Sequence, residues 1–132
     1  MNDLTKATIE AAEQWMDMSN KQNLKGLSEV TAKEIEIIGP KGKGLFSHEE
    51  LGEWMKRANL QLATKNRFVK GSTIVLEQHG TWLESDRSIK GEAIVYTVMR
   101  VKERLVQSLA RFDNKEQAFD YSGLKESNKL DC

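Results

Sequence analysis

One stretch near the middle of the chain, residues 70–82, constrains the fold more than any other. It reads KGSTIVLEQHGTW and mixes β-branched and apolar residues with polar ones. This composition predicts a long β-strand. Because side chains alternate between the two faces of a strand, Gln78 and Trp82 share one face, and Glu77 and His79 share the other. Polar groups inside an apolar strand are typical of a sheet that lines a ligand cavity.

The N-terminal segment has the period of a helix instead. Apolar and small residues recur there at spacings of three and four, namely at Leu4, Thr8, Ala11, Trp15 and Met18. This spacing predicts an amphipathic helix over residues 4–18, capped by Asn2 or Asp3. A short second helix or turn follows around residues 24–27. Residues 30–39 then alternate with a period of two, which predicts a half-buried strand ending at Gly39-Pro40.

The rest of the chain adds two helices and further strands. Ser47 and Glu50 have the spacing of a capping box, which predicts a helix over residues 48–58. Alternation predicts strands over residues 60–68, 70–82, 93–99 and 104–112. The strand over 93–99 is apolar on both faces, so we expect it to be covered on both. Asn114 then caps a short helix that Gly123 ends.

Composition limits the class of protein. The chain has 132 residues and 39% hydrophobic content, which fits one domain over residues 1–124 and a flexible polar tail over 125–132. Twenty basic and twenty acidic side chains balance, so no global field favours nucleic acid as a partner. No apolar run approaches the ~20 residues of a membrane span. One cysteine, Cys132, permits no intramolecular disulfide. We therefore expect a soluble cytoplasmic protein.

Several chemistries are excluded by missing motifs. His48 and His79 are far apart in the chain and the lone cysteine is terminal, so no metal site is expected. The glycine-rich run over residues 39–44 continues with Leu45 and Phe46, where a phosphate-binding loop needs lysine and then serine or threonine. That run is expected to be a basic turn or a lid over a pocket. No cofactor is predicted.

Three segments together resemble a known family. They are the strand over residues 30–39 with its GPKGKG ending, the helix that carries Glu53-Trp54, and residues 67–82. These segments, and the run from Leu109 to Asp113, look like the nuclear-transport-factor-2-like superfamily, and within it the SnoaL-like branch. The likeness covers about residues 4–124. It implies an α+β fold in which a strongly curved antiparallel or mixed sheet wraps around the N-terminal helices.

The resemblance also implies a site and a partner. The cone formed by the sheet would hold an apolar pocket for a small hydrophobic molecule, and two copies would pair through the outer face of the sheet. The candidate pocket residues are Trp15, Trp54, Gln78, Trp82 and Tyr96. For Trp15 and Trp54, packing in the core is the alternative role. The first functional hypothesis is therefore a protein that binds a small hydrophobic ligand in this pocket.

The second hypothesis is a cofactor-free isomerase, cyclase or dehydratase. Catalytic relatives move a proton with an acid or an acid–histidine pair inside the cone. The positions that match the arginine and aspartate of the epoxide-hydrolase relatives are Gln78 and Gly80, which cannot do that chemistry. If the opposite face points inward, Glu77 and His79 form an acid–base pair, and Arg111 binds an anionic group or pairs with Glu77. Otherwise Glu77 and His79 face solvent or an interface. One bulge would reverse the register, so both orientations stay open.

Overall fold

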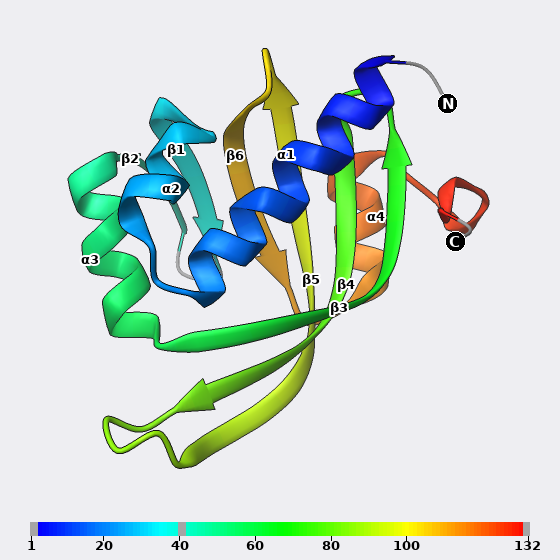
Figure 1. Ribbon diagram of the computed structural model, residues 1–132. Coiled ribbons are helices and arrows are strands. Elements are labelled where there is room, and N and C mark those ends of the chain that lie inside the picture. Colours follow the sequence, from blue (N-terminus) through cyan, green and yellow to red (C-terminus); the bar gives the residue numbers. More distant parts are fainter. Residues whose placement is uncertain (1–2, 40–41, 131–132) are drawn as a thin grey trace.

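The computed structural model describes residues 3–39 and 42–130, which form a curved six-stranded sheet covered by helices on both faces (Figure 1). Its elements are α1 (Asp3–Asn20), α2 (Leu24–Glu29), β1 (Thr31–Gly39), β2 (Gly42–Ser47), α3 (His48–Ala58), β3 (Leu60–Lys70), β4 (Thr73–Leu83), β5 (Ile89–Lys102), β6 (Leu105–Phe112), α4 (Lys115–Ser122) and the 3-10 turn η1 (Glu126–Asn128). The strand order is β2-β1-β6-β5-β4-β3. β1 and β6 are parallel, and the other neighbours are antiparallel. The predicted α+β class with a mixed curved sheet is confirmed, and the sheet is open.

Helix α1 crosses the concave face of the sheet (Figure 1). The predicted helix is confirmed, and its predicted stripe is confirmed in part, since the residues it buries are Thr8, Ala11, Ala12, Trp15 and Met16. Met18 is half-buried, and Leu4 in the first turn is 55% exposed. Trp15 is only 1% exposed. Its indole N–H donates to the Thr31 hydroxyl at 3.0 Å, and that hydroxyl donates to the carbonyl of Leu27 at 2.6 Å. The large ring is therefore buried with its polar group satisfied.

Packing on both sides of β4 decides which face of the central strand points inward. Leu76 belongs to the core cluster that contains Trp15, on the concave side. Val75 belongs to a second cluster with Phe68 and with Ala118 of α4, on the outer side. Gln78 and Trp82 therefore share the concave face with Leu76, and Glu77 and His79 share the outer face with Val75.

The curvature of the sheet comes from β3, β4 and β5. The beginning of β3, the end of β4 and the beginning of β5 curl toward α3 (Figure 1). Lys65 is an extra residue in β3, because Thr64 and Asn66 face the consecutive residues Gln78 and Glu77. A bulge of this kind bends a strand and increases its twist. The bend leaves a hollow beside α3 at the end of the sheet.

The predicted cover on both faces of β5 holds only for part of that strand. Residues 95–99 are buried or half-buried, between α1 on one side and α4 on the other. Ile94 on the outer face is 40% exposed. Pairing of two copies through this outer face stays a prediction.

Two segments differ from the prediction. Residues 42–47 form strand β2, because Leu45 and Phe46 continue the alternation and pair with β1. Residues 40–41 of the expected basic turn lie outside the described residues, as do the capping candidate Asn2 and Cys132. The tail was expected to be loose from residue 125. Instead the backbone N–H of Leu130 donates to the Arg67 carbonyl at 2.7 Å, and Lys129 bridges to Phe68. β3 is an edge strand with free backbone groups, which explains this attachment.

Candidate ligand-binding site

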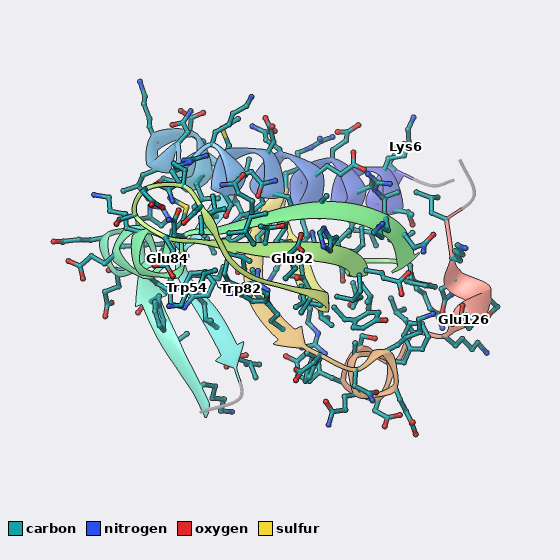
Figure 2. The ribbon with its side chains drawn as sticks, turned by 90° about the horizontal axis from the view of Figure 1, so that it is seen from below. Lys6, Trp54, Trp82, Glu84, Glu92 and Glu126 are labelled. Atoms are coloured by element: carbon teal, nitrogen blue, oxygen red, sulfur yellow. The ribbon has the colours of Figure 1, made fainter. Side chains whose placement is uncertain are left out.

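A pocket of about 410 Å³ lies in the hollow between α3 and the curled end of the sheet. Its apolar wall comes from six elements around that hollow, namely β1, α3, β3, β4, β5 and β6. The lining residues are Ile37, Ile38, Trp54, Leu60, Trp82, Ala93, Val95, Leu109, Arg111, Phe112 and Asp113. Trp54 and Trp82 lie close together in the view from below (Figure 2). The pocket is thus mainly apolar, with a guanidinium and a carboxylate among its lining groups.

Local signals in the sequence position α3 over this pocket. Ser47 accepts from the backbone N–H of Glu50 at 3.2 Å, and the Glu50 carboxylate accepts from the backbone N–H of Ser47 at 3.0 Å. The predicted capping box is therefore confirmed and begins the helix. Asn59 ends it in the left-handed conformation, and its side-chain amide donates to the Leu83 carbonyl at 3.1 Å. This bond ties the end of α3 to the end of β4, which places Trp54 opposite Trp82.

Four polar side chains form one continuous hydrogen-bonded row across the concave face. Arg111 Nε donates to the Thr97 hydroxyl at 3.3 Å. That hydroxyl donates to Gln78 Oε1 at 2.7 Å, and Gln78 Nε2 donates to the Thr64 hydroxyl at 3.1 Å. We call Arg111, Thr97, Gln78 and Thr64 the polar ladder. It links β6, β5, β4 and β3, and both Thr97 and Gln78 are fully buried.

Arg111 is the charged end of the polar ladder and the cation among the described residues that line the pocket. Its guanidinium carbon lies 5.7 Å from the centre of the Trp54 ring. Burial among these groups lowers the pKa of the Arg111 guanidinium to about 10, so it stays protonated at neutral pH. No carboxylate of the described residues is within ion-pairing distance of it.

A second, wider cavity of about 680 Å³ adjoins the pocket beside α4. It is lined by Ile38, Arg111, Phe112, Asp113, Gln117, Asp120 and Tyr121. Its first four lining residues also line the pocket, so Arg111 is reached from both cavities. Asp113 is exposed at the shared rim. We call the wider cavity the mouth of the pocket, since the two share these four lining residues.

The structure brings together only part of the predicted site. Trp54, Trp82 and Arg111 meet at the pocket. Trp15 lies in the core, and Gln78 lies in the polar ladder. Tyr96, Glu77 and His79 lie on the outer face, on the other side of the sheet from the polar ladder. The sequence reading missed Thr64 and Thr97, because their role depends on which faces of three separate strands coincide.

Glu77 and Tyr96 form a hydrogen-bonded group beneath α4. The Glu77 carboxylate accepts from the Asn66 amide and from the Tyr96 hydroxyl, the latter at 3.0 Å. Lys115 of α4 is 3.9 Å away. The Asn66 bond first, and then the Tyr96 bond and Lys115, hold the pKa of Glu77 below its ordinary value against the effect of burial. Burial and the Glu77 carboxylate raise the pKa of Tyr96.

His79 has a different neighbour on the same outer face. Its Nε2 lies 3.5 Å from a carboxylate oxygen of Glu92, and both side chains are partly exposed. A contact of this kind at the surface contributes little to stability. It does not connect His79 with Glu77 or with Arg111.

Replacing Glu77 with glutamine is expected to lower the free energy of unfolding at pH 7 by about 1 kcal/mol, because two hydrogen bonds to a charged acceptor weaken. The folded-state pKa is below the ordinary value of 4.5, so the carboxylate stabilises the fold above that pH. This contribution is lost as the pH falls through the lowered pKa. In urea unfolding, the difference in stability between the wild type and Glu77→Gln should therefore be smaller at pH 3 than at pH 7. Glu92→Gln is the control. An equal loss of stability in Glu77→Gln at both pH values would contradict the prediction.

The described residues lack two further features. They contain no group of three or more His, Cys, Asp or Glu side chains that could hold a metal ion. No helix among them is long and apolar enough to span a bilayer.

Solved structures resemble this chain although its sequence matches no protein-family model and no curated protein. A putative SnoaL-like polyketide cyclase from Jannaschia sp. CCS1 is 11% identical, with a TM-score of 0.73 over 92% of this chain and 94% of that one. A putative ketosteroid isomerase from Kribbella flavida is 13% identical, with a TM-score of 0.71 over 84% and 80%. A computationally designed 17-OHP binder is 16% identical, with a TM-score of 0.67 over 82% and 92%. At these identities the likeness confirms the expected fold alone.

Proposed function

We propose, from the premise that this chain has the nuclear-transport-factor-2-like fold, that it binds a small and largely apolar molecule in the pocket beside α3. The observation that carries this proposal is the pocket itself, in which Trp54 and Trp82 face one hollow with aliphatic side chains around them. Its volume of about 410 Å³ is within the range of small-molecule sites. Two indole rings supply large apolar contact area at little entropic cost.

Known uses of the fold support a ligand in this place. One of the similar structures is a designed binder of 17-OHP, and two others are described as a putative polyketide cyclase and a putative ketosteroid isomerase. The present chain has a fold similar to theirs, with an apolar pocket at one end of its curved sheet.

Proton-transfer catalysis has less support than binding. Glu77 and His79, the acid and base expected from the sequence, lie on the outer face of the sheet. The carboxylate among the residues that line the pocket is Asp113, which is exposed at the rim and not enclosed by apolar groups. The apolar enclosure that a carboxylate general base at neutral pH needs is therefore missing at this position.

A neutral fluorescent probe tests the proposal. We expect N-phenyl-1-naphthylamine to bind the wild-type protein with an increase in its emission. Trp82→Ala should weaken this binding by roughly tenfold or more, because burial of one large apolar side chain contributes about 1.5–3 kcal/mol. Ile94→Ala is a matched control, since Ile94 lies on β5 between two pocket residues but on the opposite face. Fluorescence titration gives both dissociation constants.

The proposal fails if the probe binds Trp82→Ala and Trp54→Ala as tightly as it binds the wild type. It also fails if Ile94→Ala weakens binding as much as Trp82→Ala does. Either result would place the apolar site outside this pocket. Circular dichroism should first establish that each variant is folded.

A further inference from the structure

The arginines of this chain do not all have the same surroundings. Arg67 pairs with Glu13, Arg104 lies 3.3 Å from a carboxylate oxygen of Glu10, and Arg100 donates to the Tyr121 hydroxyl at 2.6 Å. For Arg111, the described residues provide a hydroxyl at Nε and an aromatic ring, but no carboxylate. It is thus a cation that the protein leaves without a counter-ion in a mainly apolar pocket.

An arrangement of this kind is unfavourable for the protein alone. Arg111 is half-buried, and a charged group that is partly removed from water is stabilised by an opposite charge or several hydrogen bonds that offset its loss of hydration. Burial lowers the pKa of Arg111 but only to about 10, so the charge persists at neutral pH. Asp113 is close in sequence and lies at the same rim, yet it is exposed and makes no ion pair with Arg111.

The guanidinium is also held in a defined orientation. Nε is occupied by the Thr97 hydroxyl, which the polar ladder holds in place through Gln78 and Thr64. The Trp54 ring lies against the guanidinium. Within the described part of the chain no acceptor is bonded to either terminal nitrogen, and Arg111 lines both cavities. Two parallel N–H donors therefore remain for a planar acceptor such as a carboxylate.

We propose that the ligand of this pocket is an organic acid, whose carboxylate binds Arg111 while its apolar body lies against Trp54 and Trp82. This inference rests on the proposed binding function and specifies the class of ligand. The carboxylate supplies the missing counter-ion, and the mouth of the pocket gives it access. The apolar body accounts for the two indole rings that line the same pocket.

Two probes that differ in one group separate the binding of a carboxylate from the binding of the apolar body. 2-Naphthoate and 2-naphthamide have the same ring system, but only the first is charged. Calorimetric titration of the wild type should show naphthoate binding about tenfold or more tightly, because hydrogen bonds to charged groups are the stronger ones. Arg111→Met should abolish this preference and change naphthamide binding by less than about threefold. Arg111→Lys should keep part of the preference, because it retains the charge without the two parallel donors.

Arg104→Met is the matched control. It removes one positive charge from the exposed turn at the opposite end of β5 and β6, so it should keep the preference for naphthoate. Equal affinity of the wild type for both probes would overturn this inference and leave the apolar binding function standing. Failure of both probes, together with failure of the neutral probe above, would overturn both. The comparison of the two probes on the wild type needs no variant, so it tests the preference for a carboxylate even if Arg111→Met does not fold.

Discussion

Replacing Trp15 with alanine is expected to lower the free energy of unfolding by about 3–5 kcal/mol. The ring is 1% exposed and belongs to the main core cluster between α1 and the concave face. Its removal would leave a cavity there and would also take away the donor to Thr31. Because small domains have a total stability of about 5–15 kcal/mol, much of the fold could be lost at room temperature. Urea unfolding followed by circular dichroism measures the change.

Trp15→Phe is the control that separates volume from hydrogen bonding. Phenylalanine fills most of the site but has no N–H, so we expect a loss of about 1–2 kcal/mol. Met18→Ala, at the partly buried end of the same helix, should cost less than Trp15→Ala. A loss below about 1 kcal/mol for Trp15→Ala would show that the ring is not the centre of this core.

Replacing Gln78 with methionine should be the second large effect, with a loss of about 1–3 kcal/mol in the free energy of unfolding. Methionine is close to glutamine in length, so the change removes one buried and one partly buried hydrogen bond with little change in volume. The buried Thr97 hydroxyl and the half-buried Thr64 hydroxyl would each lose a partner. A buried polar group without a partner is costly.

The same variant should also change the binding site, because the polar ladder orients Arg111. We expect the preference for naphthoate over naphthamide to fall in Gln78→Met, although Gln78 does not line the pocket. Gln107→Met is the control, since Gln107 makes only 3.3 Å bonds to backbone carbonyls near the β5–β6 turn. If the two variants are equally stable, the polar ladder does not contribute to the fold as inferred.

Local signals in the sequence predicted most of the elements. The spacing of apolar residues predicted α1, the Ser47 and Glu50 pair predicted the start of α3, and Asn114 and Gly123 predicted the two ends of α4. Each of these signals acts within a few residues, through a cap or a helical period. β2 was missed because a short strand next to several glycines carries a weak signal.

The sequence by itself determined the kinds of elements, their order and the α+β class, because period, caps and turn residues act locally. Only the tertiary structure decided which face of residues 70–82 points inward, since both faces carry apolar and polar groups. That choice depended on Trp15 packing on one side and on α4 packing on the other. It moved Glu77 and His79 to the outside and brought Arg111, Trp54 and Trp82 from three distant segments to one pocket. Contacts between such distant segments leave no periodic trace in a single sequence.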